Sequence, residues 1–332
     1  MVQHILVKKA GVVALASVLA AGLMVPLSGC ASVAQNSEPT ASAKAAGTSA
    51  YTFTDDLGNE VTVSNPQRVV ACMGSFANIW ELAGGTLIGA TDDAFADYGI
   101  AEEGIAKMGD FTAPNLEQII AATPDFVIMT GSSSGRNGAT SQTDLKEGLT
   151  AAGIPVAYFN VTTFDDYLRM LKTCCAITGQ SERYQENGQA VADAIAQIKE
   201  KVPAGTTQST ALLMTTYSGG TRVQNSKSMT GAMLADLGVK NLADENKSLL
   251  KDFSLESVIE LDPDFIFVVP MGNDDTAAMA NLKQATQANP AWGALSAVTG
   301  GRYITLDKGL FLYKPNALWA QSYQVLFDDL YA

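Results

Sequence analysis

Histidine is almost missing from this chain: among 332 residues, His4 is the only one. It lies within residues 1–29, which have the pattern of a secretory leader, so the mature chain is expected to contain none. A Ser-His-acid hydrolase needs a histidine to take the serine proton, and zinc and manganese receptors usually rely on imidazole ligands. The lack of histidine therefore argues against these three classes of protein.

Cysteine and basic residues are also scarce. Cys72, Cys174 and Cys175 follow Cys30 and are too few for a disulfide framework in a chain of this length. Adjacent Cys174 and Cys175 are predicted to pack on a helix rather than to pair. Lysine and arginine number 21 against 34 acidic residues, which gives a net charge of −13. Nucleic-acid binding depends on Lys and Arg neutralising phosphates, so an acidic chain is a poor candidate for it.

No apolar run of membrane-spanning length occurs after residue 30. Before it, Lys8 and Lys9 precede an apolar run at 10–27, and the sequence LSGC ends at Cys30. A basic start, an apolar centre and small residues at the end are typical of a secretory signal. The final cysteine resembles that of a bacterial lipoprotein signal, in which cleavage leaves an acylated Cys30. The alternative is an uncleaved membrane anchor, because the run approaches the ~20 residues that a span needs.

The predicted organisation begins with a signal peptide at 1–29 and a flexible tether at 30–50. Residues 31–50 are small and polar, and such a segment has too little apolar surface to offset the entropy of ordering. The lipid would hold the protein on the outer face of the cytoplasmic membrane. About 280 residues follow Ala50, and a length of this order favours two domains.

After residue 50, short apolar runs alternate with helical patterns. Continuous apolar runs are typical of buried parallel strands, and their alternation with helices predicts an α/β fold with mainly parallel sheets. The predicted strands are 68–72, 86–90, 126–129, 154–159, 210–217, 265–269 and 302–306; the predicted helices are a segment around 79–83 and 116–122, 145–152, 164–179, 181–202, 229–237, 255–261 and 315–331.

Two phrases occur twice in the same order. PNLEQIIAATPDFVIM at 114–129 is echoed by FSLESVIELDPDFIFV at 253–268, and WELAGGTLIGA at 80–90 by LADLGVKNLAD at 234–244. The alternative is that the first phrase is a common unit for capping a buried strand. The repetition predicts two pseudo-symmetric α/β lobes with a ligand cleft between them, at the carboxyl ends of their strands. The lobes are assigned to 51–163 and 180–332, and one long helix at 164–179 joins them.

The repeated phrases, the lipoprotein signal, YTFTDDLGNEVTVSNPQRVVA at 51–71 and NPAWGALSAVTGGRYITLD at 289–307 resemble one family. It comprises the substrate-binding proteins of ABC importers for iron–siderophores, haem and cobalamin. The resemblance covers 51–332. It implies a monomeric, non-enzymatic binding protein without a cofactor. This protein would capture a bulky metal chelate. A ferric siderophore is the preferred ligand, and haem or cobalamin is the alternative. It also implies that one helix bridges the two lobes and that the lobes move only modestly when the ligand binds.

The resemblance also assigns a role to the repeated glutamate. In the family, a glutamate on the outer face of each lobe docks into arginine pockets of the dimeric membrane permease, and Glu117 and Glu256 match these positions. Carboxylate–arginine pairs are directional, and charges at the rim of an interface guide orientation and partner choice. The alternative is that each glutamate favours the first turn of its helix, by ~0.3–1 kcal/mol.

The main alternative function is that of a secreted acyl hydrolase, because GSSSG at 131–135 follows a strand and has the Gly-x-Ser-x-Gly form of a nucleophile elbow. It lacks the histidine base, and no Ser-x-x-Lys occupies the start of a helix after that strand. A cleft-edge loop is the preferred interpretation of Ser133 and its neighbours. A surface adhesion or scaffold protein is a third class, which the cleft architecture disfavours.

Ligand contacts are expected in the loops after the strands, at 73–76, 92–98, 132–142, 218–229, 271–275 and 308–314. Bulky rigid ligands favour aromatic walls with a few fixed polar groups, and arginines pair with carboxylates. Methionine or tyrosine would have to ligate a haem iron here, and Met73 and Tyr217 are the nearest candidates. The alternative for Met73 and Tyr217 is a position in the core or in the pocket wall. The alternative for Arg136 and Arg222 is a solvated position in a loop. The candidate residues are Met73, Phe76, Tyr98, Arg136, Tyr217, Arg222 and Phe311.

Overall fold

The structure is a computed structural model that describes residues 50–132, 141–204, 208–272, 274–287 and 289–332. The predicted leader, Cys30, Ser133 and Arg136 lie outside these residues. Residues Thr48–Ala332 form one compact unit. Within the part of the chain that the structure describes, no helix is long and apolar enough to cross a membrane.

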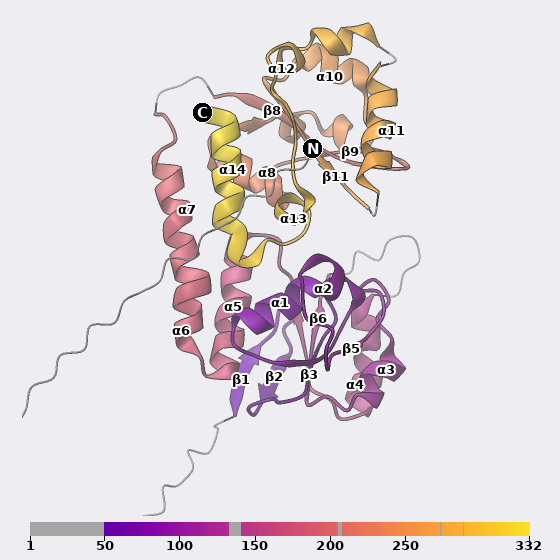
Figure 1. Cartoon of the computed structure of the whole chain (residues 1–332), viewed down its shortest axis with the longest axis vertical. Coiled ribbons are helices and arrows are strands. Elements are labelled where there is room, and N and C mark those ends of the chain that lie inside the picture. Colours follow the sequence, from indigo (N-terminus) through magenta and orange to yellow (C-terminus); the bar gives the residue numbers. More distant parts are fainter. Residues whose placement is uncertain (1–49, 133–140, 205–207, 273, 288) are drawn as a thin grey trace, which may run out of the picture. The chain divides into compact units, whose positions relative to one another are not determined.

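The first lobe is built on a parallel sheet, as the apolar runs predict. Its strands follow the order β5-β4-β3-β6-β7, and all the neighbouring strands pair in parallel. The helices of this lobe are shown with the sheet in Figure 1. The strands are β3 (Val69–Ala71), β4 (Leu87–Ala90), β5 (Ala106–Lys107), β6 (Phe126–Thr130) and β7 (Val156–Phe159), and the helices are α1 (Gly74–Leu82), α2 (Asp92–Asp97), α3 (Leu116–Ala121) and α4 (Lys146–Ala151).

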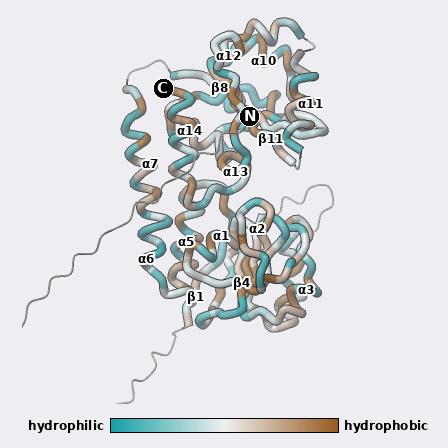
Figure 2. Tube along the Cα trace, viewed as in Figure 1, coloured by the Kyte–Doolittle hydropathy of each residue, from teal (hydrophilic) through white to brown (hydrophobic). Residues whose placement is uncertain are grey.

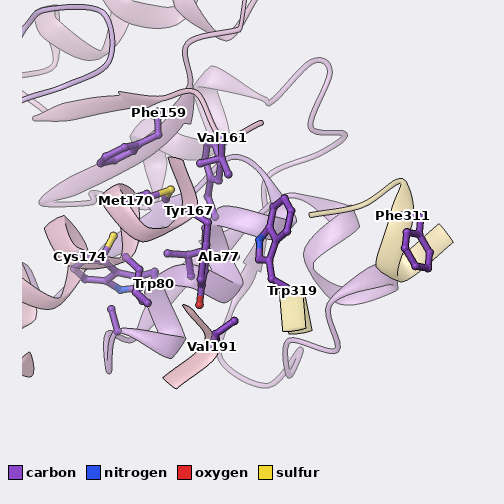
Figure 3. Close-up of a cluster of buried hydrophobic side chains, with 14 of the residues drawn as sticks. Ala77, Trp80, Phe159, Val161, Tyr167, Met170, Cys174, Val191, Phe311 and Trp319 are labelled. Atoms are coloured by element: carbon purple, nitrogen blue, oxygen red, sulfur yellow. The ribbon is translucent and has the colours of Figure 1, made fainter. Parts of the chain in front are cut away.

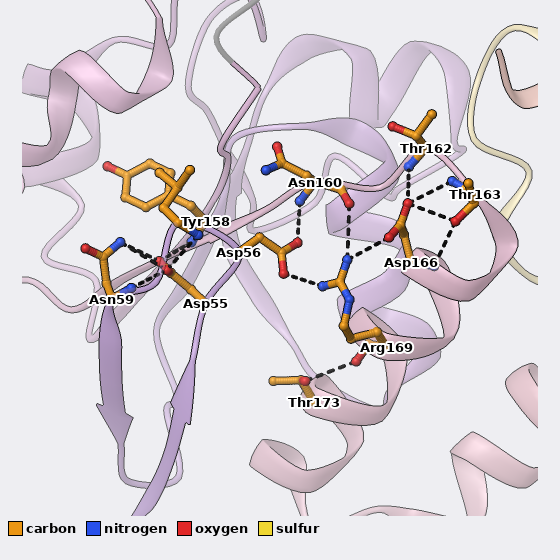
Figure 4. Close-up of polar contacts among 11 residues, drawn as sticks. Asp55, Asp56, Asn59, Tyr158, Asn160, Thr162, Thr163, Asp166, Arg169 and Thr173 are labelled. Carbon is orange, nitrogen blue, oxygen red and sulfur yellow. Dashed lines mark hydrogen bonds and ion pairs between the residues drawn. The ribbon is translucent and has the colours of Figure 1, made fainter. Parts of the chain in front are cut away.

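An antiparallel hairpin of β1 (Tyr51–Thr54) and β2 (Glu60–Val63) is fastened to this lobe by two aspartates. Asp55 accepts hydrogen bonds from the backbone N–H of Asn59 at 2.8 Å and of Tyr158 at 3.1 Å. Asp56 accepts one from the Asn160 N–H at 2.6 Å and forms an ion pair with Arg169. Figure 4 shows both aspartates between the hairpin and the helix that carries Arg169. The hairpin is thereby held against the last strand of the sheet.

The second lobe repeats the parallel sheet with one antiparallel addition. Its strands follow the order β10-β8-β11-β12, and β9 pairs antiparallel with β8. The expected loop at 218–229 therefore contains a strand. The strands are β8 (Thr210–Tyr217), β9 (Gly220–Gln224), β10 (Lys240–Asn241), β11 (Phe265–Pro270) and β12 (Tyr303–Thr305), and the helices are α8 (Met229–Asp236), α9 (Leu242–Glu245), α10 (Leu255–Leu261), α11 (Asp275–Gln287), α12 (Ser296–Thr299), α13 (Lys308–Phe311) and α14 (Trp319–Tyr331).

The repeated phrase forms the same helix-to-strand unit in both lobes, α3–β6 and α10–β11. A side-chain cap begins each helix: Asn115 accepts from the Gln118 N–H at 3.1 Å and Ser254 from the Ser257 N–H at 3.2 Å. The residue before each proline has a left-handed backbone, with φ of 48° at Thr123 and 37° at Asp262. Such a residue ends a helix.

The aspartate of each Pro-Asp-Phe then joins its strand to the neighbouring one. Asp125 accepts from the N–H groups of Gln67 and Arg68 at 2.8 and 2.9 Å, just before β3. Asp264 accepts from the Thr210 N–H at 2.8 Å, at the start of β8. Both aspartates thus align the amino ends of two paired strands. This confirms the prediction of two similar α/β lobes.

Two consecutive helical runs connect the lobes. The first, α5 (Phe164–Thr178), matches the helix predicted at 164–179; it is capped by Thr163 and ends at Gly179, whose φ is 72°. It packs against α1 and β1 of the first lobe. The second run consists of α6 (Ser181–Tyr184), a π-helical turn and α7 (Ala190–Glu200), and α7 packs against α14 (Figure 1). The predicted connection was the helix at 164–179 alone. In the structure a second helical segment follows it and packs against the second lobe.

A continuous cluster of buried side chains joins the two lobes through these helices. Trp80 of α1, Tyr167 of α5 and Trp319 at the start of α14 are each at most 2% exposed (Figure 3). The Trp319 ring lies 5.6 Å from that of Phe164. In Figure 2 the strand β4 is brown, whereas α6 is largely teal, consistent with a buried sheet and a solvated helix. The two lobes therefore share one continuous hydrophobic core.

Candidate functional site

A cleft of about 1000 Å³ lies between the lobes, at the carboxyl ends of their strands. Met73 follows β3, Asp92 follows β4, Asn160 follows β7 and Met271 follows β11, and all four line it. Strands of both lobes therefore point their carboxyl ends at the same space, as the sequence predicts for open α/β sheets. A volume of this size is at the upper end of that of sites for small molecules and cofactors.

A segment of the second lobe forms the floor of the cleft by docking on the first. The Lys314 N–H donates to the Tyr98 hydroxyl at 3.1 Å. The Asn316 side-chain amide donates to the Ser75 carbonyl and to the Asn78 side chain, both at 2.9 Å. Asn316 is 1% exposed, so these bonds are shielded from water. They fix the position of residues 313–316 within the cleft.

Two tyrosines and a lysine give this floor its chemical character. The rings of Tyr98 and Tyr313, one from each lobe, have centroids 6.5 Å apart. The Lys314 ammonium lies 3.8 Å from the Met73 sulfur. Burial lowers the pKa of Lys314, although attraction to Asp93 opposes this change. Burial likewise raises the pKa of Tyr98 and of Tyr313, so both hydroxyls keep their protons and can donate hydrogen bonds.

Tight packing of α1 on α2 shapes one wall of the cleft. A Cβ on Gly74 would lie 2.7 Å from the Ala94 nitrogen, so only glycine permits this approach. The Asp93 carboxylate therefore reaches the start of α1 and accepts from the Gly74 N–H at 2.7 Å and from the Thr91 hydroxyl at 2.6 Å. Burial raises the pKa of Asp93, and these bonds oppose the shift.

The structure brings some of the predicted ligand residues together. Met73 and Tyr98 line the cleft. Arg222 and Phe311 line a smaller cavity of about 200 Å³, which shares Met271 with the cleft. Arg136 lies outside the described residues.

Phe76 is not a ligand contact, and its assignment to the cleft is wrong. It is 0% exposed and packs edge-on against Phe159, at 6.4 Å between ring centroids. The physical reason is helical periodicity, because Phe76 precedes Ile79 by three residues and Trp80 by four. All three side chains therefore share the face of α1 that packs into the core.

Tyr217 lies at the end of β8, opposite Gly220 of β9. Its ring packs under the Arg222 guanidinium at 5.5 Å, a cation–π contact. It is not among the residues that line the cleft. The β8–β9 hairpin, which replaces the loop predicted at 218–229, accounts for this position.

Several lining residues are not among the ligand-binding candidates predicted from the sequence. Asp110 and Phe111 follow β5, a strand of two residues that is too short to recognise from an apolar run. Asn160 and Thr162 follow β7, a predicted strand, so the strand-end rule could have identified them. Gln142 lies within the predicted loop at 132–142 and donates to the carbonyls of Cys72 at 2.6 Å and Phe111 at 2.7 Å. It thereby joins two neighbouring parts of the cleft wall.

Of the described residues, no group of three or more His, Cys, Asp or Glu side chains could hold a metal ion. The cysteines Cys72, Cys174 and Cys175 are buried and free. This confirms that Cys174 and Cys175 pack on a helix rather than pair. Burial raises the pKa of Cys72 and of Cys174, which keeps these thiols protonated.

Glu117 and Glu256 occupy equivalent positions on the outside of the two lobes. Each is the second residue of its helix, α3 or α10, and each is exposed. Neither forms an ion pair with a described residue. Both are therefore free to meet groups outside the chain.

Known structures share this fold. The structure of Staphylococcus aureus SirA complexed with staphyloferrin B has a TM-score of 0.62 at 20% identity, covering 85% of this chain and 97% of that one. The iron uptake ABC transporter substrate-binding protein PiuA from Streptococcus pneumoniae has a TM-score of 0.63 at 19% identity, with coverage of 84% and 97%. The periplasmic heme-binding protein RhuT from Roseiflexus sp. RS-1 has a TM-score of 0.64 at 18% identity, with coverage of 80% and 98%.

Comparison with curated proteins finds no significant match. In contrast, the family described as periplasmic binding protein matches residues 69–310. This region begins with β3, which Met73 follows, and extends to α13, next to the floor of the cleft. The match spans well over half of the chain, and the chain therefore belongs to the periplasmic binding protein family, whose members bind solutes and are not enzymes.

Proposed function

We propose that this protein is the extracytoplasmic solute-binding component of an ABC importer and that it captures a ferric siderophore. The observation that carries the proposal is the cleft of about 1000 Å³ between two lobes with a shared core. Its floor combines aromatic rings with fixed hydrogen-bond donors, as sites for bulky rigid ligands do. The similarity to SirA, PiuA and RhuT supports an iron-containing ligand.

Haem is the second candidate, and Met73 is the observation that favours it. Met73 lines the cleft, and its thioether sulfur could ligate a haem iron there. That sulfur is 3.8 Å from the Lys314 ammonium, so haem binding would require this contact to break. Tyr217, which does not line the cleft, is a poorer candidate for an iron ligand. Cobalamin remains an alternative ligand of the same cleft.

A ligand screen tests this function. Thermal unfolding and tryptophan quenching are measured with ferric siderophores, haem and cobalamin at micromolar concentrations. At one hundred times its Kd, the correct ligand is expected to add about 2.7 kcal/mol to the free energy of unfolding, which corresponds to a rise in Tm of several degrees. A matched control is each siderophore without iron. Failure of all three classes, together with binding of metal-free compounds, would exclude a metal chelate as the ligand.

We infer the position of the protein in the cell from its N-terminal sequence. We expect cleavage before Cys30 and acylation of that cysteine, which would tether the binding unit to the outer face of the cytoplasmic membrane through residues 30–50. Labelling with palmitate should be lost in Cys30→Ser and retained in Cys72→Ser, because Cys72 is buried in the fold. Labelling that persists in Cys30→Ser would contradict the anchor.

Delivery requires recognition by the permease dimer, to which we assign Glu117 and Glu256. The positions of the two glutamates support this assignment. They are equivalent exposed carboxylates on two similar lobes, and these suit a partner with two equivalent halves. The binding unit itself is expected to act as a monomer. In this arrangement the cleft binds the chelate and the outer faces of the lobes bind the permease.

A further inference from the structure

The wall of the cleft is acidic. Among the described residues that line it, four are aspartates, whereas the single basic residue is Lys314. Residues 133–140, outside the described part, contain one charged residue, Arg136. The acidic residues therefore outnumber the basic ones even with this arginine included. The aspartates are Asp92, Asp93, Asp97 and Asp110.

Within the described part of the chain, Lys107, Lys308 and Lys314 attract Asp92, Asp97 and Asp93, respectively, without direct pairing. No ion pair joins any of the four to a described Lys or Arg. Three of them accept internal hydrogen bonds: Asp93 from Gly74 N–H, Asp97 from the Tyr313 side chain, and Asp110 from Thr112 N–H at 2.7 Å. Asp92 and Asp97 are both exposed on α2, so their charges face the space of the cleft.

The nearby basic groups do not reverse this charge. The Lys314 side chain lies at the floor, against the Met73 sulfur. Lys308 is paired with Asp275 at 2.9 Å. Arg222 is exposed and lines the smaller cavity rather than the cleft. An anionic ligand in the cleft would therefore approach several carboxylates while finding one ammonium.

Charge separates the classes of ferric chelate. Three hydroxamates, each a monoanion, balance the charge of Fe(III), whereas three catecholate dianions leave a trianion and haem carries two propionate carboxylates. Resting on the proposed function, we infer that this cleft selects a trihydroxamate-type ferric chelate that carries a protonated amine, and that it discriminates against carboxylate-rimmed and catecholate chelates. The amine would face Asp92 and Asp97, because an acidic cleft concentrates cations.

A ligand pair that differs in one charge tests this selectivity. Ferrioxamine B has a ferric trihydroxamate core and a pendant ammonium, and acetylation of that amine leaves the same core neutral. We expect the purified full-length protein to bind ferrioxamine B about tenfold more tightly than its N-acetyl derivative at low salt. The difference should shrink as ionic strength rises, because salt screens exposed charges. Ferric citrate and haem should bind more weakly than either.

Matched variants assign the effect to the α2 wall. Asp92→Asn with Asp97→Asn should reduce the preference for ferrioxamine B over the acetylated ligand to about twofold or less. The control is Asp252→Asn, an exposed aspartate outside the cleft, which should keep the tenfold preference. Equal binding of the two ligands, or tighter binding of ferric citrate or haem, would overturn the inference while leaving the proposed function intact. Binding of no ferric chelate at all would overturn both.

Discussion

Replacing both Glu117 and Glu256 by alanine is expected to abolish import of the chelate while its binding to the purified protein stays unchanged. Both side chains are exposed on the outer helices α3 and α10, and neither is among the residues that line the cleft. In an arginine pocket each carboxylate would be buried, and removing one partner of a buried hydrogen-bonded charge pair costs about 2 kcal/mol or more, which is a factor of about 30 in affinity. Two independent losses of this size multiply.

The size of the effect distinguishes docking from helix stability. If each glutamate only favours the first turn of its helix, its loss costs ~0.3–1 kcal/mol of stability, which is too little to abolish import by a folded protein. Asn115 and Ser254 would still cap the two helices in the variant. Thermal unfolding of the double variant should therefore resemble that of the unmodified protein.

Uptake of iron-labelled chelate by cells that carry the permease measures this result. Each single variant should be impaired and the double variant inactive. Glu260→Ala is the matched control, since Glu260 is an exposed glutamate on α10 beyond its first turn, and it should import normally. Import that persists in the double variant with unchanged binding would show that the permease recognises another surface.

The repeated phrase made much of the fold predictable from the sequence. Asn115 and Ser254 are recognisable N-caps, and Pro124 and Pro263 mark the ends of the two helices. A continuous apolar run begins two residues after each proline, so that β6 and β11 could be placed to within a residue. These signals are local, because a cap, a stop and a buried strand are each set by a few neighbouring residues.

The cleft was less predictable because it depends on contacts between distant segments. Lys314 reaches Tyr98 across 216 positions, and Asn316 reaches Ser75 across 241. Nothing in the local pattern around Lys314 specifies such a partner. Phe76 is a different case: its spacing from Ile79 and Trp80 indicated the buried face of α1, but its place just after a strand suggested the cleft. There, helical periodicity was the better guide.

The helical connection between the lobes was also only partly predictable from the sequence. Thr163 and Gly179 delimit α5 correctly, since an N-cap and a left-handed glycine are local signals. Contact with the second lobe depends instead on tertiary packing: α7 packs against α14, and Phe164 of α5 lies beside Trp319 at the start of α14. Both runs have apolar residues at helical spacing, so the sequence alone could not assign the crossing to one of them.

Trp80 and Gly85 form the packing contact of the first lobe whose removal we expect to be most costly. Trp80 is 1% exposed, its ring lies edge-on to Phe126 at 6.1 Å, and its indole N–H donates to the Thr86 carbonyl at 2.9 Å. A Cβ on Gly85 would lie 2.2 Å from the Trp80 ring. The φ of Gly85 is not in the left-handed region, so the indole ring alone makes glycine necessary there.

We therefore expect Trp80→Ala to lower the free energy of unfolding by about 3–5 kcal/mol, because it leaves a large cavity. Gly85→Ala alone should cost about 1–3 kcal/mol through overpacking, yet close to nothing when Trp80→Ala is already present. Gly84→Ala is the control: its φ of 80° is strained for alanine in both backgrounds, so its cost should persist. Urea unfolding followed by circular dichroism measures all five variants. Additive costs of Trp80→Ala and Gly85→Ala would contradict this account of the contact.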